Sequence, residues 1–392
     1  MSRFLFISTS EALPWGGSEV LWLLIAGELL QQGHHVAFSY QHFAEEPAPL
    51  TALKKGGAVS HYRGDPAEAA PARRILRALR RKKIRASFPA FTDPHWLLSL
   101  VMEERPDLVV LNACDAYMIW PLGHAFAALR RQGIPYTVMC HLEDESYMFN
   151  PQKRDALTAL YGGAVEVSFG APFGAALVAR QLAIRLPGVM VFDNPRNCSG
   201  EIQLWSGDAS SAARFACVGR LDVTAKGQDV LLAAFAGSVW RERNWKLSFY
   251  GKGWEKDYLE KLTVMYGLEN KVEFSGFQPG IDSVWAREHV CLQTSPKEGT
   301  PMTVVEAMSA GRPCLVTDIG RMPDLIHEGH TGWVCSRGVA SVAAALERTW
   351  AQRSEWQIMG RRAHEAISAG WNFDYPKEMA ERYVRLASGE KP

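Results

Sequence analysis

The sequence predicts an α/β protein made of two doubly wound domains, each built around a parallel sheet. The chain has 392 residues, more than one ordinary hydrophobic core accommodates. Short apolar runs alternate with helical patterns along the chain, which is typical of parallel sheets covered on both faces. This rhythm breaks at residues 195–213, which are rich in Ser, Gly and Asn. We therefore predict a domain at residues 1–195, a linker at 196–211 and a second domain at 212–370.

Twelve apolar runs are expected to form the strands of the two sheets. In the first half they are residues 4–10, 35–40, 58–63, 108–113, 136–141, 166–170 and 189–194. In the second half they are residues 214–219, 246–251, 271–277, 289–295 and 313–318. Ligands of such sheets bind at the carboxyl ends of the strands, so we expect the active site in a cleft between the two domains.

Composition and charge exclude several classes of protein. The net charge of +1 argues against a nucleic-acid partner for the molecule as a whole. The seven cysteines are scattered without a C-x-x-C pair, which favours buried free thiols in a reducing compartment over a disulfide framework. The N-terminus does not read as a signal peptide, and the longest apolar run, residues 20–30, is too short to cross a bilayer. We expect a core helix there and a cytoplasmic protein.

A turn followed by a helix is expected directly after the predicted strand at residues 289–295. Thr300 is a residue type that caps helices, and Pro301 suits the first helical position. The helix is expected to reach about Ala310, with Gly311 just beyond its end. Its amino end would therefore lie at the predicted cleft, where free backbone N–H groups favour an anion.

Two carboxylates flank the start of this predicted helix. Glu298 lies in the turn and Glu306 about 9 Å further along the helix. That separation suits two carboxylates that accept hydrogen bonds from different hydroxyls of one extended ligand. The alternative interpretation is that Glu298 caps the helix and Glu306 is a solvated helix residue.

Two cations follow the first predicted strand of the second domain. Gly219 ends this strand, and Arg220 and Lys226 come before the next helix. A planar guanidinium and a compact ammonium beside a glycine suit a diphosphate. Gly251 and Gly253 repeat the arrangement after the next strand, where they permit close backbone approach, although the full G-x-G-x-x-G pattern is absent.

A glycine pair follows the first predicted strand of the first domain. Gly16 and Gly17 precede a helix expected to begin near Ser18. Such a pair forms either a phosphate-binding loop or a simple turn. Phosphate-compatible loops are therefore expected on both walls of the cleft.

Over residues 215–334 the sequence resembles the retaining GT-B glycosyltransferases of family 4, also described as glycosyl transferases group 1. The segment from Gly219 to Gly227 matches the family's GRL…KG pattern, and the Glu298–Glu306 spacing matches its E-x7-E motif. The first half resembles the family less, mainly through residues 14–19, 29–36 and 106–112. Residues 371–392 resemble the helix that crosses back to the first domain.

The resemblance implies a GT-B architecture with two Rossmann-like domains, and it implies a role for each matching residue. Arg220 and Lys226 would neutralise the donor diphosphate, Glu306 would hold the ribose, and Glu298 would bind the transferred sugar. His141 would lie near the reacting sugar carbon; the alternative is a structural histidine. The expected catalytic residues are His141, Glu298, Arg220 and Lys226. The expected donor-binding residues are Gly16, Gly17, Gly219, Arg220, Lys226, Gly251, Phe277, Glu298, Gly299, Thr300, Pro301, Met302, Thr303, Val304 and Glu306.

The sequence departs from the family pattern at several positions. The family often places Asp directly after the histidine, whereas His141 is followed by Leu-Glu-Asp, so the part played by Asp144 is open. Arg321 stands in place of a glycine and Asp324 in place of a glutamate. Residues 191–197 also depart from the usual end of the first domain.

The resemblance implies transfer of a hexose from a nucleotide-diphosphate sugar to a hydroxyl acceptor, with retention of configuration. No D-x-D pair or His/Cys cluster has metal-ligand spacing, so we expect no metal and no cofactor besides the nucleotide sugar as co-substrate. Because no carboxylate is placed as a nucleophile, we hypothesise a same-face displacement assisted by the leaving diphosphate.

A basic segment bears on the acceptor and on location. Eight Lys and Arg residues lie between Arg73 and Arg85, with apolar residues among them. As an amphipathic helix this segment would contact anionic lipid at the inner face of the membrane or an acidic acceptor. The alternative is a solvated helix face. A lipid-linked or anionic glycan acceptor is therefore one expectation.

Other functions compete with this one. We favour a glycosyltransferase of cell-surface polysaccharide, lipopolysaccharide or glycolipid synthesis. A nucleotide-sugar epimerase of the same fold and a non-catalytic subunit that binds nucleotide sugar or glycan are the alternatives. A nicotinamide-dependent dehydrogenase is disfavoured, because neither domain has the full glycine fingerprint with an acidic residue about twenty positions on.

Overall fold

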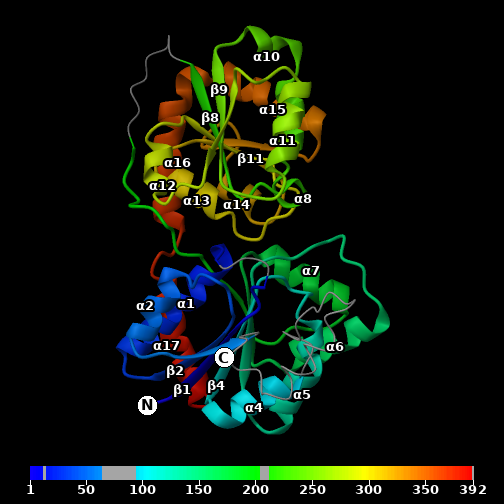
Figure 1. The fold of residues 1–392 in the computed structure, drawn as a ribbon, viewed down its shortest axis with the longest axis vertical. Helices are drawn as coiled ribbons and strands as arrows, with labels where there is room; N and C mark the ends of the chain where they lie inside the picture. The colour runs from blue at the N-terminus through cyan, green and yellow to red at the C-terminus, as the bar shows by residue number, and fades with distance from the viewer. Residues whose placement is uncertain (12–14, 64–93, 204–211, 391–392) are drawn as a thin grey trace. The chain divides into compact units, whose positions relative to one another are not determined.

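The computed structural model describes residues 1–11, 15–63, 94–203 and 212–390 (Figure 1). The chain forms two compact units, each described here by itself. The first comprises Met1–Pro195 together with Asp374–Pro392, and the second comprises Arg196–Phe373. The basic segment from Arg73 to Arg85 lies outside the described residues.

The first unit is built on a seven-stranded parallel sheet with the order β3-β2-β1-β4-β5-β6-β7. Its strands are β1 (Arg3–Ser8), β2 (His35–Gln41), β3 (Val59–Arg63), β4 (Leu108–Ala113), β5 (Tyr136–Cys140), β6 (Glu166–Phe169) and β7 (Val189–Val191). All seven strands predicted in the first half are confirmed, as is their parallel pairing.

Both faces of this sheet are covered because its strands are apolar on both sides. Phe4 and Phe6 face one helical layer, and Leu5 and Ile7 face the other. The first layer consists of α1 (Gly17–Gln31), α2 (Ala48–Lys55) and α17 (Tyr375–Ala387) (Figure 1). The second consists of α4 (Pro94–Glu104), η1 (Trp120–Leu122), α5 (Gly123–Arg131), α6 (Pro151–Gly163) and α7 (Pro172–Leu182). The predicted core helix at residues 20–30 is therefore confirmed as part of α1.

The second unit is built on a six-stranded parallel sheet with the order β10-β9-β8-β11-β12-β13. Its strands are β8 (Ala213–Val218), β9 (Trp245–Tyr250), β10 (Val272–Gly276), β11 (Val290–Gln293), β12 (Cys314–Thr317) and β13 (Gly332–Cys335). The five predicted strands are confirmed. The sixth, β13, was not predicted, because its four residues include a glycine and a tryptophan and give no clear apolar run.

Helices cover this second sheet in the same way. One face carries α9 (Gln228–Phe235), α10 (Ser238–Glu242), α11 (Lys256–Met265) and α15 (Val339–Ala351). The other carries α12 (Ile281–Trp285), α13 (Met302–Ser309), α14 (Met322–Leu325) and much of α16 (Trp356–Gly370). Short α8 (Val223–Lys226) and η2 (Arg353–Glu355) complete the unit. Residues 196–203 group with this unit: the Arg312 guanidinium donates to the carbonyl of Gln203.

The helices and the cysteines bear on two expectations drawn from the sequence. Among the described residues, no helix is both long and apolar enough to span a bilayer. Five cysteines are buried and two, Cys114 and Cys198, are half-buried; all seven are free thiols.

Candidate functional site

The loops after β8 and β9 run side by side at the carboxyl edge of the second sheet. The N–H of Gly219 donates to the Tyr250 carbonyl at 2.8 Å, and that of Leu221 donates to the Lys252 carbonyl at 3.1 Å. A Cβ on Gly251 would lie 2.0 Å from the Gly219 oxygen, and Gly251 has φ 142°. Gly251 is thus glycine because two loops touch there, which is a different reason from the phosphate contact that the sequence suggested.

Lys226 and Glu298 are brought together by this edge although they are distant in sequence. The Lys226 ammonium lies 2.5 Å from Oε1 of Glu298, and both side chains are mostly buried. The same oxygen accepts hydrogen bonds from Nε2 of Gln293 at 2.9 Å and from Oγ of Ser295 at 3.2 Å. Glu298 is therefore a carboxylate with several partners in the loop after β11, and Pro301, not Glu298, occupies the N-cap position of α13.

Arg220 lies in the loop after β8, just ahead of α8, which carries Lys226. Its guanidinium pairs with Asp222 at 3.1 Å and lies over the Trp254 ring at 5.4 Å. Gln228 fixes its backbone by donating to the Arg220 carbonyl at 2.7 Å. Its Nε is enclosed and has no hydrogen-bond partner among the described residues. The ion pair with Asp222 uses Nη2 and the Arg220 side chain is 36% exposed, so the guanidinium keeps other donors for an anion.

The start of α13 differs from the prediction. Pro301, in place of Thr300, occupies the N-cap position and gives no side-chain cap, and the first helical residue is Met302. The Thr303 hydroxyl donates to the Val218 carbonyl at 3.2 Å, which ties α13 to the end of β8. At the other end Gly311 has φ 73°, as expected for a glycine just beyond a helix.

Glu306 is buried, so the interpretation of a solvated helix residue is wrong. Burial is the main cause that raises its pKa to about 7, and the charge of Asp282 acts in the same direction. A hydrogen bond from the Asn197 backbone acts in the opposite direction. The carboxyl group therefore changes charge near neutral pH.

The other predicted donor residues of this unit have different surroundings. Phe277 follows β10 and is 65% exposed. The carbonyl of Gly299 accepts a hydrogen bond from the Arg321 backbone at 3.2 Å. Arg321, which stands where the family resemblance implies a glycine, lies with its guanidinium 4.4 Å from the centre of the Trp371 ring. Val304 is fully buried in the core beneath α13.

His141 lies at the end of β5 in the first unit and is buried. Its Nε2 lies 2.7 Å from Oδ1 of Asn112, at the end of β4. Burial lowers the pKa of the imidazole to about 3, so the ring is neutral across the usual working range. Gly16 is the N-cap residue of α1 in extended conformation, and Gly17 is the first helical residue.

The two carboxylates after His141 have different surroundings. Asp144 accepts hydrogen bonds from the backbone and hydroxyl of Ser146 at 2.8 and 2.6 Å, so it stabilises its own turn. Glu143 is buried against Gly174, where an added Cβ would lie 2.6 Å from its carboxyl carbon. Burial is the main cause that raises the pKa of Glu143 to about 8. Sequence reasoning raised Asp144 and overlooked Glu143.

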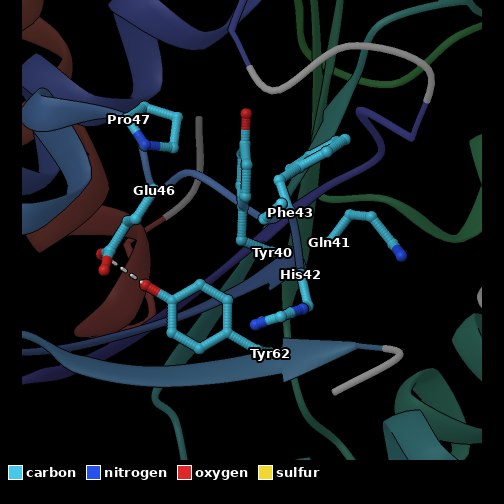
Figure 2. Close-up of a pocket in the computed structure, with 8 residues that line it drawn as sticks. Tyr40, Gln41, His42, Phe43, Glu46, Pro47 and Tyr62 are labelled. Carbon is cyan, nitrogen blue, oxygen red and sulfur yellow. Dashed lines mark hydrogen bonds between the residues drawn. The ribbon is translucent and has the colours of Figure 1, made fainter. Parts of the chain in front are cut away.

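The structure also has a cavity of about 270 Å³ in the first unit, which sequence reasoning missed. Figure 2 shows its aromatic side chains and Glu46, which accepts from the Tyr62 hydroxyl at 2.7 Å. The ammonium of Lys54 holds the other oxygen of Glu46 at 2.9 Å. The cavity lies beside the carboxyl ends of β2 and β3, and its lining is Tyr40, Gln41, His42, Phe43, Ala44, Glu46, Pro47 and Tyr62.

One group of potential metal ligands lies elsewhere in the first unit. The donor atoms of His61, Glu103 and Glu104 lie within 4.8 Å of one another in the described part of the chain. Nε2 of His61 already lies 2.7 Å from Glu104, and His35 lies 2.9 Å from the other oxygen. These residues come from two strands and a helix, so no sequence spacing could reveal them.

The sequence of the second unit matches a known family. Residues 212–352 match the family model described as "Glycosyl transferases group 1". The N-acetyl-alpha-D-glucosaminyl L-malate synthase of Bacillus anthracis is 33% identical over 144 residues, which are 36% of this chain and 36% of that protein. The lipopolysaccharide 1,6-galactosyltransferase of Salmonella typhimurium is 32% identical over 131 residues, 32% of this chain and 36% of that protein. The chain thus matches only about a third of the length of these relatives.

Similar folds extend over the whole chain. Sucrose-phosphate synthase of Thermosynechococcus elongatus has a TM-score of 0.75 at 17% identity, covering 99% of this chain and 100% of that one. HepE of Anabaena, in complex with UDP and glucose, has a TM-score of 0.72 at 17% identity, covering 98% and 100%. Such likeness shows the fold alone. The chain therefore has the GT-B fold, and residues 212–352 carry the sequence pattern of the glycosyl transferases group 1 family, whose named relatives support a transferase.

Proposed function

We propose that the protein is a retaining, metal-independent glycosyltransferase that moves a hexose from a nucleotide-diphosphate sugar to a hydroxyl acceptor. The observation that carries the proposal is the contact between Lys226 and Glu298 at the edge of the second sheet, beside Arg220. Cations for a diphosphate and a carboxylate for sugar hydroxyls are the two kinds of group that a nucleotide sugar needs.

The charge that develops on the leaving diphosphate is stabilised by Arg220 and Lys226. Preorganised donors of this kind supply a large part of catalysis in group transfer. Glu298 binds hydroxyls of the hexose, and Glu306 accepts from the ribose. The bond from the anomeric carbon to the diphosphate oxygen breaks as the bond to the acceptor oxygen forms on the same face. The acceptor proton passes to the departing diphosphate oxygen.

The acceptor is proposed to be a glycan or a lipid-linked sugar. This rests on relatives named for such substrates, among them the lipopolysaccharide galactosyltransferase and a GDP-mannose-dependent alpha-(1-6)-phosphatidylinositol monomannoside mannosyltransferase of Mycobacterium tuberculosis. The second of these is 28% identical over 171 residues, 40% of this chain and 43% of that protein. An aromatic-lined cavity with a fixed carboxylate, Glu46, is suited to a polar ring.

Calorimetry tests the donor site directly. UDP, GDP, ADP, CDP and dTDP are titrated into the full chain with EDTA present, and Arg220→Ala is measured beside it. Arg241→Ala, in the same unit but on α10, is the matched control. We expect one diphosphate to bind selectively and Arg220→Ala alone to lose it. Binding of none of the five, or equal binding by both variants, would overturn the proposal.

A further inference from the structure

Three potential metal ligands come together on the face of the first sheet that α4 covers. They are the imidazole of His61 on β3 and the carboxylates of Glu103 and Glu104 at the end of α4, and their donor atoms lie within 4.8 Å of one another. We propose that these three residues bind a divalent transition-metal ion of the zinc type, with water completing its coordination. Because β3 is the edge strand, the ion fastens α4 to the edge of the sheet.

The fold places His61 and the end of α4 on the same face of the sheet. Val59 of β3 pairs with Ala37 of β2, and His61 lies two residues further along β3. Side chains alternate along a strand, so His61 emerges on the face to which Ala37 belongs. Ala37 packs in the core that includes Leu100 of α4. The last two residues of α4 therefore reach the strand that carries His61.

Glu104 presents its two carboxylate oxygens to different partners. Oε1 lies 2.7 Å from Nε2 of His61. Oε2 lies 2.9 Å from Nε2 of His35 and 3.4 Å from the Arg3 guanidinium. A carboxylate that ligates a metal is itself oriented by hydrogen bonds from outer partners. His35 and Arg3 are such partners, because they hold Oε2 and leave Oε1 facing the imidazole that would share the ion.

The charges of the cluster favour a cation when the imidazoles are neutral. Glu103 and Glu104 then carry two negative charges, and Arg3 offsets one of them. An ion between Oε1 and His61 takes the place of the proton that the two groups share. Zinc bonds of about 2.0–2.1 Å place ligand atoms about 3.3 Å apart, so Oε1 and Nε2 must separate by about 0.6 Å. Glu103 is exposed, so its side chain has room to close on the ion.

The donor set selects the class of ion. Magnesium and calcium prefer sites made of oxygen ligands. An imidazole suits zinc and its neighbours in the first transition row, and zinc also binds carboxylate oxygens. One nitrogen and two carboxylates therefore favour zinc over magnesium or calcium.

This site is separate from the proposed transfer and does not rest on it. Glu104 contacts Arg3 and His35, which are the first residues of β1 and β2. The first-unit residues expected at the donor lie instead beyond the carboxyl ends of strands, as His141 does after β5. The ion would act on the stability of the first unit, and the transfer itself remains metal-independent.

Zinc binding to the full chain tests the site. The protein is freed of metal with EDTA, the chelator is removed, and ZnCl₂ is titrated by calorimetry, with MgCl₂ and CaCl₂ in parallel. We expect His61→Gln to weaken zinc binding by at least about 100-fold, because an amide does not replace the imidazole lone pair. His35→Gln is the matched variant. Its amide still donates to Oε2 of Glu104, so its affinity should stay within about tenfold of the parent, the low end for outer partners.

Glu103→Gln keeps the proposal testable if His61→Gln does not fold, because Glu103 is exposed. We expect its zinc affinity to fall at least about tenfold. Glu381→Gln, also exposed and on α17 of the same unit, is the control and should bind zinc like the parent. The melting temperature of the parent should rise with zinc concentration, since the folded site binds the ion, and that of Glu103→Gln should rise less.

Three results would overturn the proposal. Equal zinc affinity in the parent, His61→Gln and Glu103→Gln would place the ion elsewhere, for instance on the free thiols. Tighter binding of magnesium or calcium than of zinc would contradict the class of ion. Absence of zinc binding by the parent would show that the cluster consists of ion pairs and hydrogen bonds alone.

Discussion

The two units hold their site carboxylates in different ways. Glu19 in the first unit is bonded by neutral donors from several elements and is wholly enclosed. Glu298 in the second unit also accepts from two neutral side chains, Gln293 and Ser295, but its shortest contact is with the ammonium of Lys226, which is carried on a flexible four-carbon stem. The hydrogen bonds of Glu19 are all internal to the unit. The ion pair of Glu298, in contrast, includes a lysine that a bound phosphate would also attract. Rigid positioning and exchangeable binding are thus divided between the units.

Removing the exchangeable cation should have the largest effect. In Lys226→Ala the diphosphate loses a charged donor, and Glu298 is left without its ion-pair partner. We expect kcat/KM for transfer to fall about 10²–10³-fold, as for other preorganised donors. Lys256→Ala, on an exposed helix of the same unit, is the control and should be unaffected. A fall of less than about threefold in Lys226→Ala would remove the basis for calling this a binding pair.

Among the described residues of the first unit, Glu143 and Glu166 each have a buried carboxylate oxygen without a hydrogen-bond partner. Glu143 therefore tests whether every carboxylate of that unit is held as firmly as Glu19. Its folded pKa of about 8 lies above the ordinary value of 4.5, so the folded state binds more protons between these pH values. The contribution of Glu143 to stability is therefore highest below pH 4.5 and is lost progressively as pH rises from 4.5 to about 8.

Glu143→Gln should remove this pH dependence. We expect the free energy of unfolding of the variant to fall by about 3 kcal/mol less than that of the parent between pH 5 and pH 8. Urea unfolding at both pH values measures the difference. Glu145→Gln, two residues on and exposed, is the matched control. Parallel pH dependence in Glu143→Gln and the parent would show that this carboxyl ionises normally.

Gly251→Ala tests how closely the loops of the second unit must approach. The added methyl would lie 2.0 Å from the Gly219 carbonyl oxygen, at a φ that alanine avoids. We expect the free energy of unfolding to drop by about 2 kcal/mol, in the range for overpacked sites. Gly280→Ala in the same unit is the control, since nothing lies within 4 Å of its added methyl. Equal urea midpoints for the two variants would contradict the loop contact.

Glu306 should give the smallest effect, a change of affinity with pH. Its pKa of about 7 means that the carboxylate, which accepts hydrogen bonds, forms as pH rises from 6 to 8. Affinity for the nucleoside diphosphate should rise about fivefold over this range, beyond the change caused by the ligand's own phosphate. Glu306→Gln separates the two contributions. Calorimetry of this variant should show only the change caused by the ligand's phosphate. If the affinity of Glu306→Gln and that of the parent depend on pH in the same way, Glu306 does not bind the ribose.

Short-range patterns predicted most of the fold, because a buried parallel strand is recognisable from its own residues. The twelve predicted strands depended on apolar runs such as that of β4, and only β13 lacked one. The start of α13 was misjudged because Thr300 has the right residue type for a cap, but the turn places Pro301 at that position. Residue type alone does not fix the direction in which a loop enters a helix.

The candidate site was predictable only where chemistry depends on charge and spacing. Lys226 and Glu298 were expected to serve one ligand, but their direct contact depends on which strands are neighbours. Gln293 and Ser295 both donate hydrogen bonds to Glu298. They are uncharged and belong to no recognisable motif, so the sequence did not reveal this role. The network of Glu19, Asn112 and His141 joins helix α1 to the ends of two strands, so no local pattern contains it.

The contact between Lys226 and Glu298 also bears on how a reaction cycle would end. A complete nucleotide sugar that draws the lysine to its phosphates brings hydroxyls that replace the lysine at Glu298. The nucleoside diphosphate left after transfer brings none, so holding it leaves Glu298 without a charged partner. Return of Lys226 to Glu298 then favours departure of the spent nucleotide. The same ion pair would thus set how strongly the nucleoside diphosphate inhibits the reaction. It would therefore also set the concentration of nucleoside diphosphate at which transfer stops.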